Sequence, residues 1–274
     1  MKEQLANLNT ETTNRKEALT MKKNVRTNVL ALILVAVVLF TTAAMLVGCS
    51  ASTQKAADTP ADTAVTTLLG DSPEWVTKLD AAKDAKQLFV VAAHEKTTAW
   101  VSMHEKDENG KWHMIMTTPG FIGKNGLGKT MEGDGKTPVG TFGFNAAFGI
   151  ADDPGCKIPY TKVDDNAYWS GDTCNGMQYN KMVSIKDYPD LNKDDSEHII
   201  DYTRHYQYCL NISYNEACDT NAGSAIFLHC LGPNKPFTGG CVAIPENQMK
   251  FVMQHVDPGC KVVIDSLENL GGEF

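Results

Sequence analysis

Residues 225–230 read Ala-Ile-Phe-Leu-His-Cys, and residues 238–244 read Thr-Gly-Gly-Cys-Val-Ala-Ile. The first stretch is a short apolar run of the kind that forms a buried β-strand, and His229 closes it. In the second stretch, Cys241 follows two glycines and stands just ahead of a predicted helix. A strand end and a tight turn therefore each present one chemically reactive side chain.

Further short runs towards the amino end also predict strands. They are rich in β-branched and aromatic residues, are separated by Gly, Asn, Asp and Pro, and cover residues 87–93, 98–104, 112–117 and 139–144. Residues 107–110, Asp-Glu-Asn-Gly, predict a hairpin between two of them. Many short strands with few helices favour a sandwich or barrel.

One clear helix is predicted after Cys241. Pro245 suits a first helical turn, and apolar residues then recur at helical spacing until Asp-Pro-Gly at residues 257–259 ends the pattern. We therefore predict a single, mainly β domain over residues 86–268, with one or two short helices, followed by a tail over residues 269–274.

The amino-terminal residues have the order of an export signal. A basic flank at residues 22–26 precedes an apolar run over residues 29–47. Residues 46–49, Leu-Val-Gly-Cys, resemble the lipobox of bacterial lipoprotein signal peptides. Met21 stands directly ahead of the basic flank and is an alternative start, and a plain transmembrane anchor is the alternative interpretation of the apolar run.

The lipobox resemblance implies a signal peptide over residues 1–48 and lipidation of Cys49. It also implies that the chain is an extracytoplasmic lipoprotein of the bacterial cell membrane that faces the cell wall. Residues 49–85 are rich in Ala, Thr, Asp and Ser, and we predict that they form a tether between the lipid and the domain.

The composition argues against nucleic-acid and nucleotide partners. The chain of 274 residues has 25 Lys and Arg against 33 Asp and Glu, and a net charge of −8 gives no basic surface for phosphates. Residues 123–130, Gly-Lys-Asn-Gly-Leu-Gly-Lys-Thr, match a phosphate-binding loop, which works only when a helix follows it. Residues 131–138 contain two glycines and a proline, so we predict a surface loop instead.

Cys241 and His229 together suit thiol acyl transfer. The thiolate attacks a carbonyl, while the imidazole takes the thiol proton and later gives one to the leaving amine. The N–H groups of Gly240 and Cys241 are predicted to hold the developing oxyanion. The helix that follows is predicted to lower the pKa of the thiol below its usual value of ~8.5. A structural histidine and a disulfide-bonded cysteine are the alternatives.

Three motifs carry a resemblance to a known family. Residues 132–142, residues 224–229 and residues 238–243 resemble the L,D-transpeptidase catalytic domain, also called the YkuD domain. The resemblance implies a β-sandwich or barrel of mixed sheets that acts on peptidoglycan stem peptides without a metal or cofactor. It also implies Cys241 as nucleophile, His229 as general base, Gly240 in the oxyanion hole, and transfer to an amine or, in an L,D-carboxypeptidase, to water.

The sequence departs from the family at the nucleophile. The family's common ending is Ser-His-Gly-Cys with an Arg or Asn two residues later, whereas this chain has Thr238, Gly239 and Ala243 at those positions. The loop between His229 and Cys241 is also shorter than in the family, which indicates a divergent subgroup with a different acceptor or substrate. A catalytically silent envelope-binding lipoprotein and another surface thiol hydrolase are the alternative functions.

Six cysteines remain besides Cys49 and Cys241: Cys156, Cys174, Cys209, Cys218, Cys230 and Cys260. An even count in an exported domain predicts disulfides, locally Cys209 with Cys218 and Cys156 with Cys174. A pairing of Cys230 would hold its neighbour His229 in place. Zinc is the alternative, but the spacings are irregular and lack a Cys-x-x-Cys pair, so we predict no metal.

Overall fold

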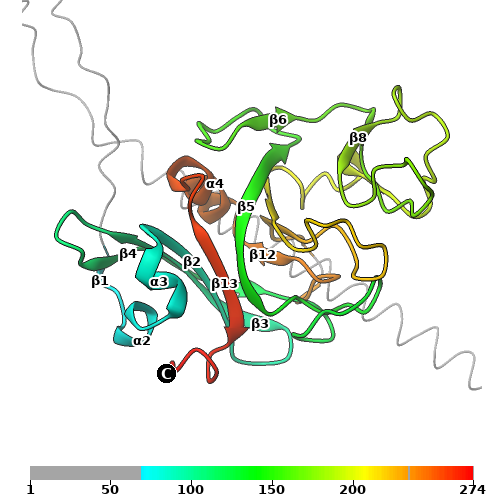
Figure 1. Cartoon of the computed structure of the whole chain (residues 1–274). Helices are drawn as coiled ribbons and strands as arrows, with labels where there is room; N and C mark the ends of the chain where they lie inside the picture. The colour runs from blue at the N-terminus through cyan, green and yellow to red at the C-terminus, as the bar shows by residue number, and fades with distance from the viewer. Residues whose placement is uncertain (1–68, 234, 274) are drawn as a thin grey trace, which may run out of the picture. The chain divides into compact units, whose positions relative to one another are not determined.

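The computed structural model describes residues 69–233 and 235–273, which form a mainly β unit (Figure 1). The predicted signal peptide, Cys49 and most of the predicted tether lie outside the described residues. No helix in the described ranges is long and apolar enough to cross a bilayer.

The strands are β1 (Gly70–Asp71), β2 (Gln87–Ala93), β3 (Thr98–Lys106), β4 (Trp112–Phe121), β5 (Gly140–Gly149), β6 (Tyr160–Lys162), β7 (Ala167–Trp169), β8 (Met182–Ser184), β9 (Glu197–His198), β10 (Cys209–Ile212), β11 (Phe227–Cys230), β12 (Val242–Ile244) and β13 (Lys261–Ser266). The α-helices in the described ranges are α2 (Glu74–Thr77), α3 (Asp80–Asp84) and α4 (Glu246–His255), and a 3₁₀ turn, η1, covers Ile199–Asp201. The prediction of a mainly β fold is confirmed, and the predicted hairpin at residues 107–110 joins β3 to β4.

The main sheet closes on itself like a barrel. Its strand order is β1-β4-β12-β11-β10-β5-β13-β2-β3, and β3 also pairs with β4 to complete the ring. The sheet is mixed, because β11 pairs with β12, and β13 with β2, in parallel. Alternate residues of these strands fill the interior with a large apolar cluster that includes Leu228, Val242 and Ile244. This interior is the core on which the positions of the outward-facing side chains depend.

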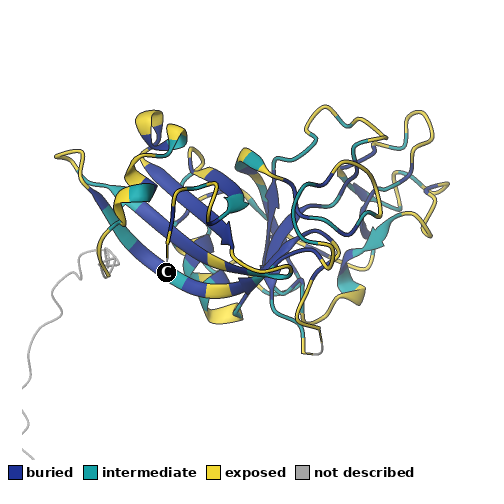
Figure 2. Ribbon diagram, turned by 90° about the horizontal axis from the view of Figure 1, so that it is seen from below, coloured by how far each residue is buried: buried dark blue, intermediate teal, exposed yellow. Residues whose placement is uncertain are grey.

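The outer face of β10 and β11 is covered by the loop-rich segment between β5 and β10. This segment contains a small second sheet, β8-β7-β9, and contributes Trp169, Ile199 and Tyr206 to a second apolar cluster. That cluster also holds Phe227 and Cys241. In Figure 2 the buried residues follow the strands, whereas exposed residues concentrate in the loops and short helices.

The folded region begins earlier than the predicted domain boundary at residue 86. β1 pairs with β4, and α2 and α3 pack on the barrel through Val76 and Ala82, which are buried. Leu270, in the predicted tail, packs against the same cluster. The assignment of residues 69–85 to a tether is therefore corrected, because these residues bury apolar side chains that a tether would leave in water.

The predicted disulfides are absent from the described residues. All seven cysteines there are free thiols, including both predicted pairs, Cys209 with Cys218 and Cys156 with Cys174. Cys209 packs in the outer cluster and Cys230 in the barrel interior, so these neighbours on paired strands face opposite ways. Burial in apolar surroundings accounts for both thiols without a covalent partner.

Candidate active site

The parallel pairing of β11 with β12 brings the two predicted reactive residues to one face of the barrel. His229 lies opposite Ala243, and Leu228 opposite Val242, so the same register places Cys241 beside Phe227. Leu228 and Val242 point into the barrel, and side chains alternate along a strand. Phe227, His229 and Cys241 therefore share the outer face, where the Tyr206 ring contacts both Phe227 and His229.

The sulfur of Cys241 lies between two main-chain groups of residues 225–227. Its thiol donates to the carbonyl oxygen of Ala225 at 3.2 Å, and the N–H of Phe227 donates to the sulfur at 3.3 Å. His229 donates through Nδ1 to the carbonyl of Cys230 at 2.9 Å, because a carbonyl can only accept. In the neutral ring this bond leaves Nε2 as the basic nitrogen.

Both side chains are neutral in this resting arrangement. Burial raises the pKa of the Cys241 thiol to about 12, an effect that the carboxylate of Glu197 adds to and the Phe227 N–H and Lys129 oppose. Burial lowers the pKa of His229 to about 4, and the Cys230 carbonyl opposes this shift. Burial thus shifts the thiol pKa in the direction opposite to the one expected from the helix that begins at Glu246.

The turn that carries Cys241 is held by two threonine hydroxyls. Thr137 donates to the Gly240 carbonyl at 2.7 Å, and Thr238 donates to the Cys241 carbonyl at 2.7 Å. A Cβ on Gly240 would lie 2.8 Å from the carbonyl oxygen of Lys136, so only glycine allows this approach. The N–H of Gly240 donates to the Thr238 hydroxyl at 3.1 Å. That donor is already used, which leaves the Cys241 N–H as the candidate for an oxyanion.

The loop that resembles a phosphate-binding loop has a structural role. No helix follows it; instead, Asp134 accepts the N–H groups of Thr130, Met131 and Lys136. Lys129 forms a buried ion pair with the same carboxylate at 3.3 Å. The carboxylate of Asp134 therefore bonds the loop's own N–H groups and lysine and holds the loop together.

The structure adds site residues that the sequence analysis missed. Glu197 accepts a hydrogen bond of 2.6 Å from the Tyr206 hydroxyl, and its charge acts on Cys241. Burial raises the pKa of Glu197 to about 7, the Tyr206 bond opposes this, and Glu132 adds to it. Glu132 in turn accepts hydrogen bonds from Ser224 at 2.8 Å and Tyr179 at 3.0 Å. Glu132 and Ser224 begin two of the motifs quoted in the sequence analysis, whereas Glu197, in β9, and Tyr206 lie outside all three motifs.

The described residues contain no group of three His, Cys, Asp or Glu side chains arranged to hold a metal ion. Cys49, the predicted lipidation site, lies outside them.

Residues 86–264 match the YkuD family, the L,D-transpeptidase catalytic domain. The match covers well over half of the chain and includes every residue of the site just described. The chain belongs to the YkuD family.

Solved structures give weaker likenesses to this YkuD domain. The helical cell shape determining protein Pgp2 of Campylobacter jejuni is 17% identical over 66% of this chain and 48% of its own, with a TM-score of 0.36. An L,D-transpeptidase of Stackebrandtia nassauensis is 14% identical over 67% of this chain and 57% of its own, with a TM-score of 0.31. The chain thus spans about half the length of these proteins. No curated protein matches it.

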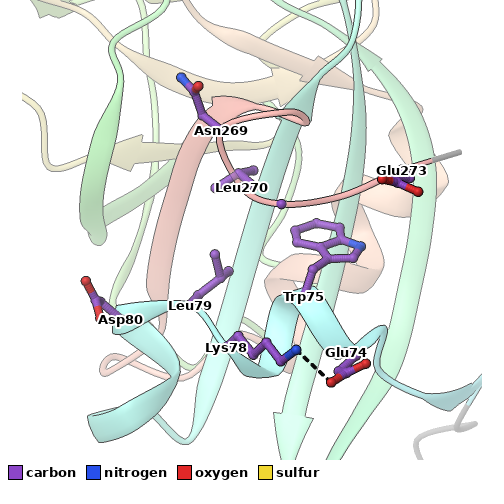
Figure 3. A pocket seen from close by; sticks show the side chains of 9 residues that line it. Glu74, Trp75, Lys78, Leu79, Asp80, Asn269, Leu270 and Glu273 are labelled. Carbon is purple, nitrogen blue, oxygen red and sulfur yellow. Dashed lines mark ion pairs between the residues drawn. The ribbon is translucent and has the colours of Figure 1, made fainter.

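A groove in the described part of the YkuD protein lies away from this site. Figure 3 shows it between α2 and the C-terminal segment, where Trp75, Leu79 and Leu270 line it together with charged groups such as Glu74 and Glu273. None of its lining residues takes part in the contacts of Cys241 or His229 described above. It therefore adds nothing to the chemistry of the site.

Replacing Thr137 with valine tests whether its hydroxyl holds the nucleophile's turn. Valine keeps the shape but leaves the Gly240 carbonyl and the Gly123 N–H, which donates to Thr137 at 2.9 Å, without their buried partner. We expect Thr137→Val to lower the free energy of unfolding by about 1–3 kcal/mol in urea titrations. Thr137→Ser keeps the hydroxyl and should lose less. Equal stability of the two variants would contradict this role.

Glu197 predicts a specific pH dependence for the thiol. When Glu197 is ionised its charge opposes the thiolate, and below its pKa of about 7 it is neutral. Glu197→Gln should therefore speed alkylation of Cys241 by iodoacetamide about threefold to tenfold at about pH 8.5, and change it little at about pH 6. Peptide mass spectrometry measures the rate.

The matched control for this charge change is Glu216→Gln. Glu216 is exposed and is bonded to Asn145, with no effect on Cys241. A Glu197→Gln rate that equals the wild-type rate at both pH values, or that Glu216→Gln reproduces, would remove Glu197 from the site.

Proposed function

We propose that this YkuD protein is a cysteine acyl-transferase of peptidoglycan stem peptides, with Cys241 as nucleophile and His229 as general base. The family membership supports the class of reaction and substrate. The observation that carries the residue assignment is the shared outer face of β11 and β12, where Cys241 and His229 are diagonal neighbours around Phe227 and Tyr206.

The reaction begins with proton transfer from the Cys241 thiol to Nε2 of His229, which leaves the electron pair on sulfur. The sulfur attacks the stem-peptide carbonyl, and the Cys241 N–H is placed to stabilise the oxyanion. The imidazolium then protonates the leaving amine as the carbon–nitrogen bond breaks, and a thioester remains on Cys241. An amine of a second stem or a water molecule resolves the thioester, giving a cross-link or a trimmed stem.

His229 suits this role because its tautomer is fixed. The bond from Nδ1 to the Cys230 carbonyl holds the ring and turns Nε2 away from that carbonyl. Burial also keeps the ring neutral, so that it is ready to accept a proton. Gly239 stands where the family has a second histidine, so the nucleophile's turn supplies no histidine of its own. We therefore assign the base role to His229 on β11.

Cys241→Ala and His229→Ala test the assignment with purified protein and a tetrapeptide muropeptide. We expect the wild type to form a thioester adduct visible by intact mass, and Cys241→Ala to form none. His229→Ala should lower kcat/KM at least about 100-fold, since it removes the proton acceptor. The product separates the two outcomes of the thioester: a cross-linked dimer indicates an amine acceptor, and a shortened stem indicates water.

Cys174→Ala is the matched control, because Cys174 is an exposed thiol and should leave turnover unchanged. Product formation by Cys241→Ala would refute the nucleophile assignment. A wild-type protein that binds muropeptides without forming an adduct would instead support the alternative of a catalytically silent envelope-binding lipoprotein.

We also propose that the chain is anchored at the outer side of a bacterial membrane through a lipid on Cys49. The lipobox at residues 46–49 supports this location, which would place the domain beside the cell wall. Labelling cells with a clickable fatty acid should tag the wild type and Cys174→Ser, but not Cys49→Ser. A tag that persists on Cys49→Ser would exclude this anchor.

A further inference from the structure

Ala225 has an unfavourable backbone conformation directly beside the nucleophile. Its φ of 55° lies in the left-handed region, which alanine rarely occupies because Cβ crowds the neighbouring carbonyl. Such a conformation persists only when the surroundings hold it. Its carbonyl oxygen is the atom that accepts the Cys241 thiol hydrogen.

The side chain of Asn180 holds Ala225 in this conformation. Its Oδ1 accepts the N–H of Ala225 at 3.0 Å and the indole N–H of Trp169 at 3.0 Å. Its Nδ2 donates to the carbonyls of Tyr214 at 3.2 Å and Asn215 at 3.0 Å. Asn180 is buried, and these bonds use the full capacity of its amide. A fully bonded buried amide ties Ala225 to three other segments of the chain.

This anchoring fixes which state of the thiol is favoured at rest. The Ala225 carbonyl can accept a hydrogen from a thiol, but it repels a thiolate. The Phe227 N–H, at 3.3 Å on the same sulfur, acts in the opposite sense. While the carbonyl of Ala225 keeps its place, the hydrogen stays between sulfur and oxygen and is not shared with His229.

We propose that Asn180 is a positioning residue for Cys241: by holding Ala225 in the left-handed conformation, it keeps the sulfur as a neutral thiol bonded to the Ala225 carbonyl. The hydrogen must leave the Ala225 carbonyl for Nε2 of His229 before the sulfur can attack. This inference rests on the proposed function for the role of Cys241 as nucleophile, but the property it predicts is the reactivity of the thiol itself.

The test is alkylation of the folded protein with iodoacetamide across a range of pH, followed cysteine by cysteine by mass spectrometry. Asn180→Ala releases Ala225, so we expect Cys241 to react at least about fivefold faster and its pH profile to shift to lower pH. Ala225→Gly alone should stay close to the wild type, because glycine accepts this φ without strain. The double variant Asn180→Ala/Ala225→Gly should return most of the way to the wild-type rate.

The buried thiols Cys209 and Cys230 report on loosening of the fold in the same samples. A parallel rise at all three cysteines, an unchanged or slower rate at Cys241, or a double variant as fast as Asn180→Ala would each overturn the proposal. If Asn180→Ala does not fold, Ala225→Val makes the same test with Asn180 intact, since a β-branched residue disfavours positive φ. It should speed alkylation of Cys241, and an unchanged rate would overturn the proposal.

The proposed function and this inference can fail separately. A wild type that forms no thioester with muropeptides, in which Asn180→Ala still speeds alkylation of Cys241 alone, would refute the acyl-transferase and keep the positioning role. A wild type that forms the thioester, with Asn180→Ala showing no selective change, would refute the positioning role and keep the enzyme.

Discussion

The site depends on the parallel pairing of β11 with β12. With Leu228 opposite Val242, apolar side chains of both strands enter the barrel, and His229 and Cys241 remain on the outer face. A slip of one residue would exchange the two faces, since side chains alternate along a strand. It would place the sulfur inside the barrel and an apolar side chain at the site. The packing of the barrel interior therefore specifies the register that the chemistry needs.

Contacts ahead of β12 and along its edge with β4 secure this register. Before β12, the threonine hydroxyls of Thr137 and Thr238 fix the carbonyls of Gly240 and Cys241. On its other edge, β12 pairs with β4 at Ala243, where a Cβ on Gly120 would lie 3.0 Å from the Ala243 carbonyl oxygen. Residues 123–138 thus serve the nucleophile's turn through the Thr137 hydroxyl and through the Lys124 N–H, which donates to the Thr238 carbonyl at 3.0 Å, so the glycine-rich motif has a structural role.

Local patterns in the sequence predicted β2 to β5 and β11, because strand formation follows from short apolar runs such as residues 87–93 and 225–230, but they did not predict β1 or β6 to β10. They also identified Cys241 and His229 as a candidate pair through the glycines and the apolar strand around them. The partners Asn180, Glu197 and Tyr206 were not predictable in this way. Asn180 and Tyr206 lie in irregular segments and Glu197 in the two-residue strand β9, where no periodicity marks a residue, and their contacts around the site arise from long-range packing.

The cysteines show how composition alone misleads. An even number of thiols predicted disulfides, Cys209 with Cys218 and Cys156 with Cys174, but all four are free thiols, and Cys209 is buried in the outer apolar cluster, which accounts for it without a covalent partner. The Gly240 N–H was also assigned from local sequence alone. The sequence shows that glycine allows a tight turn, but it does not show that the Gly240 N–H already donates a hydrogen bond to the Thr238 hydroxyl.

Burial determines how the reaction must start. The pKa of Cys241 is raised to about 12 and that of His229 is lowered to about 4, so the neutral pair is strongly favoured over thiolate and imidazolium in the closed site. Desolvation causes both shifts, and a substrate that brings its own polar groups changes that environment when it binds. The same substrate offers the carbonyl on which the developing charge moves from sulfur to oxygen. Proton transfer to His229 then takes place with the substrate bound, directly before attack, and the sulfur need not exist as a free thiolate while the site is empty.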